Sequence, residues 1–241
     1  MPTAARRKWL AKLLSAHADQ FEQRRLEVSN YLGRGLFETS TDLRYLVRFG
    51  TPELFQRFVA HSFTNDLKLR GEIESKIEER AGVVLPIEDR MLTSMQMRFD
   101  EAGVTIDEVP ESPRDTWGGS MRDKLKRLGM EEMYQGAFAG PSSAFTHGGW
   151  HELVTYHLRQ AENGEGYYAA TAFSDVRPQP AQLVCVLVTE AVAEYLVEQL
   201  PEAQERNDLL DQLVAMHDAA AEMGQLHEDF LGRTGGPELS A

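Results

Sequence analysis

The chain has 241 residues, of which 42% are hydrophobic and 26% are charged, as in a globular protein with a large core. Its formal net charge of −13 argues against non-specific binding to the phosphate backbone of nucleic acids. The only cysteine is Cys185, so an intrachain disulfide is excluded, which agrees with a reducing cytoplasm.

Two helices are predicted in the first part of the chain, the second over 31–48, because apolar residues recur at intervals of three and four. The first begins with basic residues but has the spacing of an amphipathic helix, so it does not resemble a secretory signal. His17 lies on it, at a position expected to be half-buried or exposed. Thr51, Pro52 and Glu53 then supply an N-cap, a first-turn proline and an acid, which predict the start of a third helix.

Capping residues and glycines mark helix ends in the middle of the chain. Ser120 with Asp123 resembles a capping box that opens a helix, and Gly103 follows a periodic run, where a C-terminal glycine belongs. The stretches 102–117 and 162–181 are predicted to be long loops, and loops of this length are often lids or partner contacts.

The stretch "LVCVLVTEAVAEYLV", which begins at Leu183, is predicted to be the central and most buried helix. A buried strand over "LVCVLV" is the alternative, because a short apolar run does not by itself distinguish a helix from a strand. Glu190, Glu194 and Glu198 interrupt the apolar run, so we expect no membrane span. A last helix is expected to open at Pro201.

Together these patterns predict an all-α fold, a single-domain helical bundle of about seven helices with two long loops. The domain is expected to span 1–231, and the tail 232–241 is expected to be disordered. Within the bundle, we expect the 31–48 helix to pack against the segment 131–158.

The segment 137–151, "AFAGPSSAFTHGGWH", is the first candidate site. If it is helical, Ser143, His147 and His151 lie four residues apart along one face. The two glycines that follow His147 are poor helix formers, each costing about 1 kcal/mol relative to alanine. Such glycines indicate that another backbone or a ligand approaches this face closely.

A second polar stripe lies on the predicted 31–48 helix. Arg34, Glu38 and Asp42 are spaced four residues apart there, and Thr41 and Tyr45 form a neighbouring pair. An exposed arginine–glutamate pair contributes only about 0.3–0.5 kcal/mol, whereas a pair that faces the core needs further hydrogen-bond partners. The serine or histidine of the first candidate site would supply those partners.

The stretches "YLGRGLFETSTDLRYLV" and "TWGGSMRDKLKRLGMEEMYQGAFAGPSSAFTHGG" hold Arg34 with Glu38, then Tyr134, then Ser143 with His147. This order resembles a bacterial helical family that is catalogued only as a domain of unknown function. The resemblance covers roughly residues 20–200. It implies an all-helical fold and brings no established activity.

Several interpretations of these residues are open. In a metal site, Glu38 and Asp42 from one helix would join His147 and His151 from the other. In a hydrolase, Ser143 would be the nucleophile and His147 its base, although no Gly-x-Ser-x-Gly elbow is present. A helical ribonuclease is a further alternative, which the acidic charge disfavours. In a structural network, the same polar groups would only fix the register of the helices.

We favour a cytoplasmic binding or interaction protein with a polar pocket where the 31–48 helix meets the 131–158 segment. A hydrolytic enzyme, metal-assisted or ribonuclease-like, that uses the same residues is the alternative. The sequence assigns no catalytic residue, no metal ligand and no cofactor. The expected partner is a small molecule or a protein, not nucleic acid or a membrane. The sequence is also compatible with a homodimer. The expected pocket or polar network comprises Arg34, Glu38, Asp42, Tyr45, Tyr134, Ser143, His147 and His151.

Overall fold

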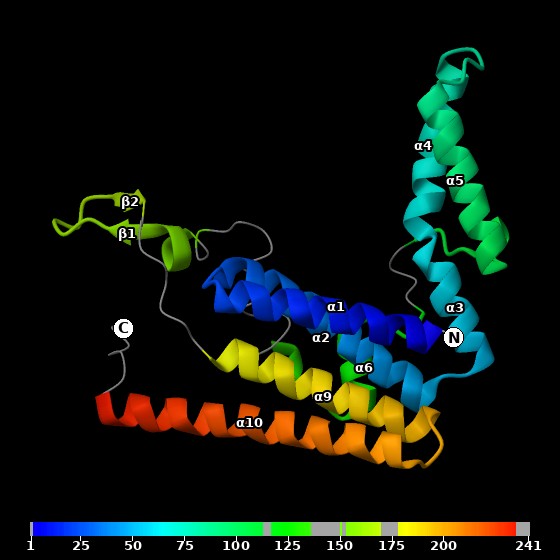
Figure 1. The fold of residues 1–241 in the computed structure, drawn as a ribbon. Helices are drawn as coiled ribbons and strands as arrows, with labels where there is room; N and C mark the ends of the chain where they lie inside the picture. Colours follow the sequence, from blue (N-terminus) through cyan, green and yellow to red (C-terminus); the bar gives the residue numbers. More distant parts are fainter. Residues whose placement is uncertain (1, 113–116, 136–149, 151–152, 170–177, 235–241) are drawn as a thin grey trace. The chain divides into compact units, whose positions relative to one another are not determined.

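Helices dominate the computed structural model, which describes residues 2–112, 117–135, 150, 153–169 and 178–234 (Figure 1). Within these residues the paired strands form one small hairpin, so the predicted all-α fold is confirmed. In chain order the elements are α1 (Pro2–Glu22), α2 (Leu26–Phe49), α3 (Pro52–Ser62), α4 (Thr64–Glu79), α5 (Pro86–Ala102), the 3-10 turn η1 (Ile106–Glu108), α6 (Met121–Leu128), the π-helical turn η3 (Leu153–His157), β1 (Leu158–Gln160), β2 (Tyr167–Ala169), α9 (Gln179–Gln199) and α10 (Gln204–Thr234).

The chain forms two compact units. The first unit consists of Met1–Arg48 with Leu125–Ala241, and the inserted unit consists of Phe49–Lys124. Helix α6 begins in the inserted unit and ends in the first unit. A single domain over 1–231 stays a prediction, because it concerns whether both units unfold together.

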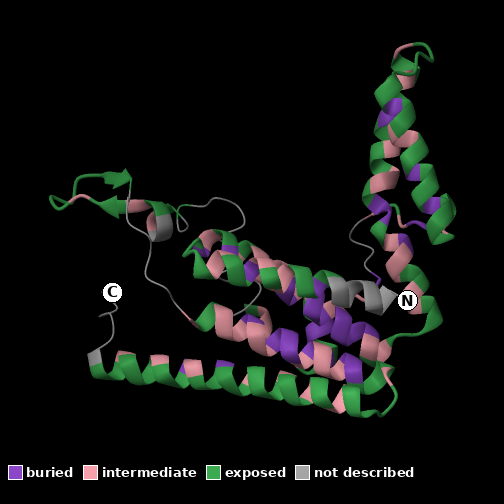
Figure 2. Ribbon diagram, viewed as in Figure 1, coloured by how far each residue is buried: buried purple, intermediate pink, exposed green. Residues whose placement is uncertain are grey.

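Helix α9 lies at the centre of the first unit. Its Val184 and Val188 belong to a buried cluster with Leu10 of α1 and with Leu36 and Leu43 of α2. Buried parts of these helices are purple in Figure 2. Each fully buried leucine or valine contributes about 1.5–3 kcal/mol. The "LVCVLV" run is therefore confirmed as part of a central helix, and the strand alternative is wrong. The prediction that this helix is the most buried one is also wrong, because α2 has more buried residues than α9. Helix α10 packs along α9.

Helix α9 is also long and apolar enough to cross a membrane, by length and composition alone. The core helix of a globular unit passes the same test, so this property is weak support for a membrane span. Helix α9 packs against α1, α2 and α10, and 39% of its apolar window is buried among the described residues.

Helices α4 and α5 form an antiparallel hairpin in the inserted unit (Figure 1). At the base of the hairpin, Phe63, Phe99 and Val109 form a small buried cluster, in which the two phenylalanine rings lie 4.6 Å apart. Nearby, Trp117 meets Phe58 edge-on at 5.1 Å. Among the described residues, this aromatic cluster of the inserted unit is smaller than the buried cluster of the first unit.

The helix caps predicted at Thr51, at Ser120 with Asp123 and at Gly103 are confirmed. Thr51 Oγ1 accepts a hydrogen bond from the Leu54 N–H at 3.2 Å at the start of α3. At the start of α6, the Asp123 N–H donates to Ser120 Oγ at 3.2 Å, and the Ser120 N–H donates to Asp123 Oδ2 at 2.9 Å. Gly103 ends α5 with a left-handed φ of 63°, a conformation that favours glycine.

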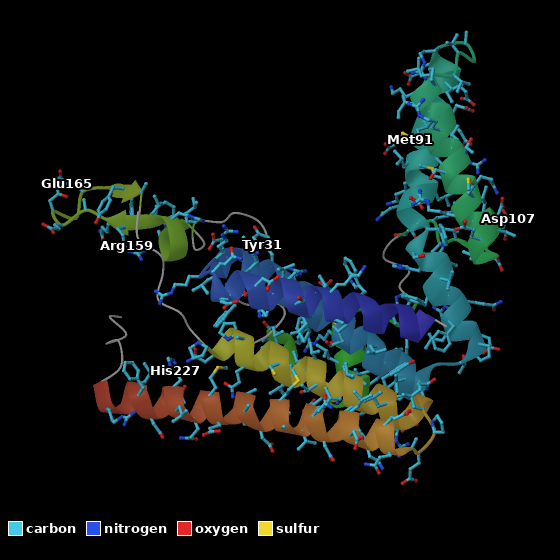
Figure 3. The ribbon with its side chains drawn as sticks, viewed as in Figure 1. Tyr31, Met91, Asp107, Arg159, Glu165 and His227 are labelled. Atoms are coloured by element: carbon cyan, nitrogen blue, oxygen red, sulfur yellow. The ribbon has the colours of Figure 1, made fainter. Side chains whose placement is uncertain are left out.

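Several predicted boundaries differ from the structure. The stretch 102–117 contains η1, and the stretch 162–181 contains β2 and the start of α9. The strands have three residues each, and alternation over so few residues is too short to recognise in a sequence. Glu165, in the turn between them, points outward (Figure 3).

Two predicted helices are also placed differently. Helix α2 begins at Leu26, earlier than expected, because the apolar periodicity of 31–48 extends towards the N-terminus. Helix α10 begins at Gln204 and not directly after Pro201. The described part of the segment 131–158 includes the π-helical turn η3 and the first residue of β1.

Candidate functional site

The predicted polar stripe of α2 contains the expected ion pair. Arg34 Nε donates to Glu38 Oε1 at 3.0 Å across one helical turn, and the exposed fractions of the two side chains are 26% and 42%. This pair is therefore confirmed, in a setting between the core and the surface. Such a pair contributes only about 0.3–0.5 kcal/mol to the stability of the helix. Its main property is therefore that it places a guanidinium and a carboxylate at this position.

Thr41 and Tyr45 lie on the same side of α2 as this ion pair, one and two turns further along. Tyr45 is fully buried, and its hydroxyl accepts a hydrogen bond from Arg127 of α6, whose guanidinium carbon lies 5.1 Å from the centre of the tyrosine ring. Thr41 is fully buried too, and its Oγ1 has no hydrogen-bond partner among the described residues. A buried hydroxyl without a partner costs about 1–3 kcal/mol, so a polar atom placed beside Thr41 would be stabilised.

The other predicted site residues are described only in part. Ser143, His147 and His151 lie outside the described residues. Tyr134 and Asp42 are described, and both are half-buried. The meeting of α2 with the serine–histidine face therefore stays a prediction.

The metal interpretation also stays untested. Within the described part of the chain, no three His, Cys, Asp or Glu side chains are grouped closely enough to hold a metal ion. Two of the four residues in that interpretation, His147 and His151, lie outside this part.

A second polar cluster, which we call the arginine clamp, was not predicted from the sequence. It consists of Arg44 and Arg48 on α2 with Glu190 and Glu194 on α9. Arg44 Nη1 lies 2.8 Å from Glu190 Oε2, and Arg44 Nη2 lies 2.5 Å from Glu194 Oε1. Arg48 Nη2 approaches the same Glu194 oxygen at 2.5 Å, and Arg48 Nε donates to Glu194 Oε2 at 3.1 Å.

The arginine clamp joins the two helices that supply most of the buried cluster of the first unit. Arg44 is buried, and its Nε has no hydrogen-bond partner among the described residues. His217 of α10 lies 4.0 Å from Glu190 Oε1, so the clamp also reaches the third helix of this unit. The signal in the sequence was two arginines one turn apart on α2 and two glutamates one turn apart on α9.

The prediction that His17 is half-buried or exposed is wrong. His17 is buried between α1 and α2, where its Nδ1 lies 2.9 Å from the Ser29 carbonyl oxygen and 3.0 Å from Ser29 Oγ. Its Nε2 has no hydrogen-bond partner among the described residues. Burial lowers the pKa of His17, with a smaller opposing effect from the Ser29 hydrogen bond, so the neutral imidazole is favoured.

The inserted unit contains a separate surface cleft of about 470 Å³. It lies between α3 and the turn after α5, and its lining includes Glu53, Arg57, Val104 and Glu108. The charged side chains at its edge are exposed, and Glu53 and Glu108 are already engaged with the backbone at the starts of their helices. The cleft therefore offers no buried polar group that would orient a ligand, and we assign no site to it.

Comparison with known proteins identifies one family. A group described as a family of unknown function, DUF5677, matches residues 10–166, a span that includes Arg34, Glu38, Tyr134, Ser143 and His147. The comparison with curated proteins and the comparison with solved structures each gave no match. The match covers more than half of the chain and agrees with the resemblance seen in the order of these five residues. The chain therefore belongs to DUF5677, a family of unknown function.

Proposed function

We propose that this chain is a cytoplasmic binding or interaction protein, with a polar pocket between the 31–48 part of α2 and the segment 131–158. The observation that carries the proposal is the buried hydroxyl of Thr41, which has no partner among the described residues. It lies on the side of α2 that also bears the Arg34–Glu38 pair.

The chemistry of this face suits a small polar ligand. The guanidinium of Arg34 has N–H donors, and the carboxylate of Glu38 has acceptor oxygens. The hydroxyl of Thr41 can donate or accept a hydrogen bond. A ligand with both donors and acceptors, such as an amide or a zwitterion, would satisfy the Thr41 hydroxyl and add hydrogen bonds to the paired side chains of Arg34 and Glu38. A protein segment would present the same groups through its backbone, so a peptide ligand belongs to the same class.

A thermal-shift screen of untagged protein against a library of polar metabolites tests the proposal. Glu38→Gln is the test variant, because it removes the charge and keeps the shape. Glu74→Gln is the matched control, because Arg70 and Glu74 form the same kind of pair on α4, at 2.8 Å. We expect at least one compound to raise the Tm of the wild type and of Glu74→Gln, and to lose most of that effect with Glu38→Gln. If no compound stabilises the protein, or if Glu38→Gln responds like the wild type, the proposal fails.

The enzymatic alternative is separated by His147→Ala. If the site is hydrolytic, turnover of model ester or phosphodiester substrates is lost in this variant while its Tm is unchanged. If the site only binds, no turnover is seen in the wild type. Elemental analysis of the untagged protein, with a melt in the presence of a chelator, tests the metal-assisted form of this alternative.

A further inference from the structure

The end of the α4–α5 hairpin carries a run of exposed aliphatic side chains, which we call the hairpin tip (residues 83–87, "VVLPI"). Val83 is 59% exposed, Val84 48%, Leu85 42% and Ile87 52%. Single exposed apolar residues are common on protein surfaces, whereas contiguous apolar patches mark interaction sites. The hairpin tip is a contiguous patch, because its four aliphatic residues occupy one turn and the first residues of α5.

Polar contacts beneath the hairpin tip hold its backbone in place. Arg80 Nη2 lies 2.5 and 2.6 Å from the two carboxylate oxygens of Glu88, and Glu88 Oε2 accepts a hydrogen bond from the Leu85 N–H at 2.9 Å. Arg80 Nε donates to the Val83 carbonyl oxygen at 3.3 Å. Ala81 is kept at a left-handed φ of 54°, which costs a non-glycine residue about 1–2 kcal/mol. A surface fixed in this way loses less conformational entropy when it binds.

The buried apolar residues of the α4–α5 hairpin lie away from its tip. Ile73 of α4 and Met95 of α5 are buried, but both lie towards the middle of the hairpin. Met91, on α5 (Figure 3), is only half-buried. The aliphatic side chains of the tip therefore stay in contact with water in the described part of the chain.

The charges next to the hairpin tip are mainly negative. Between Glu72 and Arg90 there are six acids and three bases. Two of these bases are paired within the hairpin, because Lys76 pairs with Glu79 at 2.8 Å and Arg80 pairs with Glu88, whereas the third, Arg90, is exposed close to the tip. The exposed carboxylates of Glu78 and Asp89 outnumber the exposed guanidinium of Arg90, so the surroundings of the tip keep a net negative charge.

We propose that the hairpin tip is a docking surface for a partner protein that presents an apolar groove with a lysine- or arginine-rich rim. Burial of the four aliphatic side chains supplies the binding affinity. The carboxylates beside the tip supply specificity, because they attract a partner whose groove is lined at its edge by lysine or arginine. Anionic membranes and nucleic acids are repelled by those carboxylates. A second copy of this chain would bring two negative rims together, which costs free energy. This surface does not depend on the site on α2.

The first step of the test is photo-crosslinking in cells of the source organism, with the full chain carrying benzoylphenylalanine in place of Val84. The matched control carries it in place of Thr93, an exposed residue further along α5. We expect a protein adduct from position 84 that is absent from position 93. Adducts only with lipid, with nucleic acid or with a second copy, or no specific adduct at all, would overturn the proposal.

The second step is titration of the purified crosslinked protein with wild-type and variant chains. Val84→Asp should weaken binding roughly tenfold or more, because it replaces a buried aliphatic contact with a charge. Thr93→Asp adds the same charge away from the tip and should leave the affinity unchanged. Asp89→Lys should weaken binding severalfold, with a smaller effect at high salt. Equal affinities for the wild type and Val84→Asp would overturn the proposal, provided that circular dichroism shows both chains folded.

Discussion

Arg44 is a charged residue buried in the core, and its position is set by the two carboxylates that face it from α9. A buried guanidinium without such partners would be strongly unfavourable, because taking the charge out of water costs several kcal/mol. The pairing does not show that the arginine clamp is more stable than an apolar contact of the same volume. What the pairing requires is a register of α2 and α9 that brings acceptor oxygens to the buried guanidinium of Arg44.

Replacing Arg44 with alanine should therefore lower the free energy of unfolding by about 2–4 kcal/mol, because it leaves Glu190 and Glu194 without their buried partner. The cost stays below that of a fully buried pair because both carboxylates are partly exposed. Urea denaturation followed by circular dichroism measures the change. Arg70→Ala, which removes an exposed pair within α4, should cost no more than about 0.5 kcal/mol. Equal losses in the two variants would show that the clamp is not buried in solution.

His17 should make the first unit less stable in acid. Burial lowers the pKa of His17 below its ordinary value of 6.5, so the unfolded chain binds a proton more readily than the folded chain. The contribution to stability is therefore present above about pH 6.5 and is lost as the pH falls below that value. His17→Asn keeps a donor for the Ser29 carbonyl but cannot titrate, so its Tm should fall less than that of the wild type between about pH 7.5 and about pH 5.5. A fall of equal size in both proteins would contradict this assignment.

Some of these contacts could be predicted from the sequence, and others could not. The Arg34–Glu38 pair follows from spacing, because both residues lie on one helix, one turn apart. The partners of Arg44 lie 146 and 150 residues further along the chain. Periodicity shows which residues share a face of one helix, but it does not show which helix that face meets. For the same reason the burial of His17 was not foreseen.

At the scale of the elements, prediction succeeded where a local rule acts within a few residues. The box formed by Ser120 and Asp123 and the left-handed Gly103 need only neighbours in sequence. The β1–β2 hairpin was missed because its strands are short and exposed, so no burial pattern marks them.

Gly33 offers a test of helix packing within α2. A Cβ added there would lie 3.5 Å from Val184 Cγ2 and 3.7 Å from His17 Cε1, which are ordinary van der Waals distances. Gly33→Ala should therefore stabilise the protein, by up to about 0.8 kcal/mol, because alanine favours the helix. Gly33→Leu should destabilise it by about 1–3 kcal/mol, because the larger side chain does not fit against α1 and α9. Thermal denaturation of the two variants measures both effects, and destabilisation by alanine would mean that these helices pack more tightly than the structure shows.

At the scale of the whole molecule, the sequence of a small unit is inserted between the two sequence segments that form a larger unit. Composition and periodicity predicted helices throughout, and they did not reveal that residues 49–124 make most of their contacts with one another. This division depends on contacts between distant residues, which sequence spacing does not encode. The family match spans both units but ends before α9, so the central helix of the first unit lies outside it.

The two units should differ in their local stability. Amide hydrogens of α2 and α9, which carry the larger buried cluster, should exchange with deuterium more slowly than those of α4 and α5. Hydrogen exchange followed by mass spectrometry of peptic peptides measures the difference. Slower exchange in α4 and α5 would indicate that the hairpin is covered in solution by something other than the described residues.

The two halves of the arginine clamp are synthesised at different times, because they lie far apart in the sequence. Translation proceeds from the N-terminus, so Arg44 leaves the ribosome 146 residues ahead of Glu190. At ~5–20 residues per second, that interval is about 7–30 s. When the apolar helix α9 emerges, the arginines of the clamp and the apolar residues of α1 and α2 that cluster with it have already been synthesised, whereas α10, which packs along α9, is made after it.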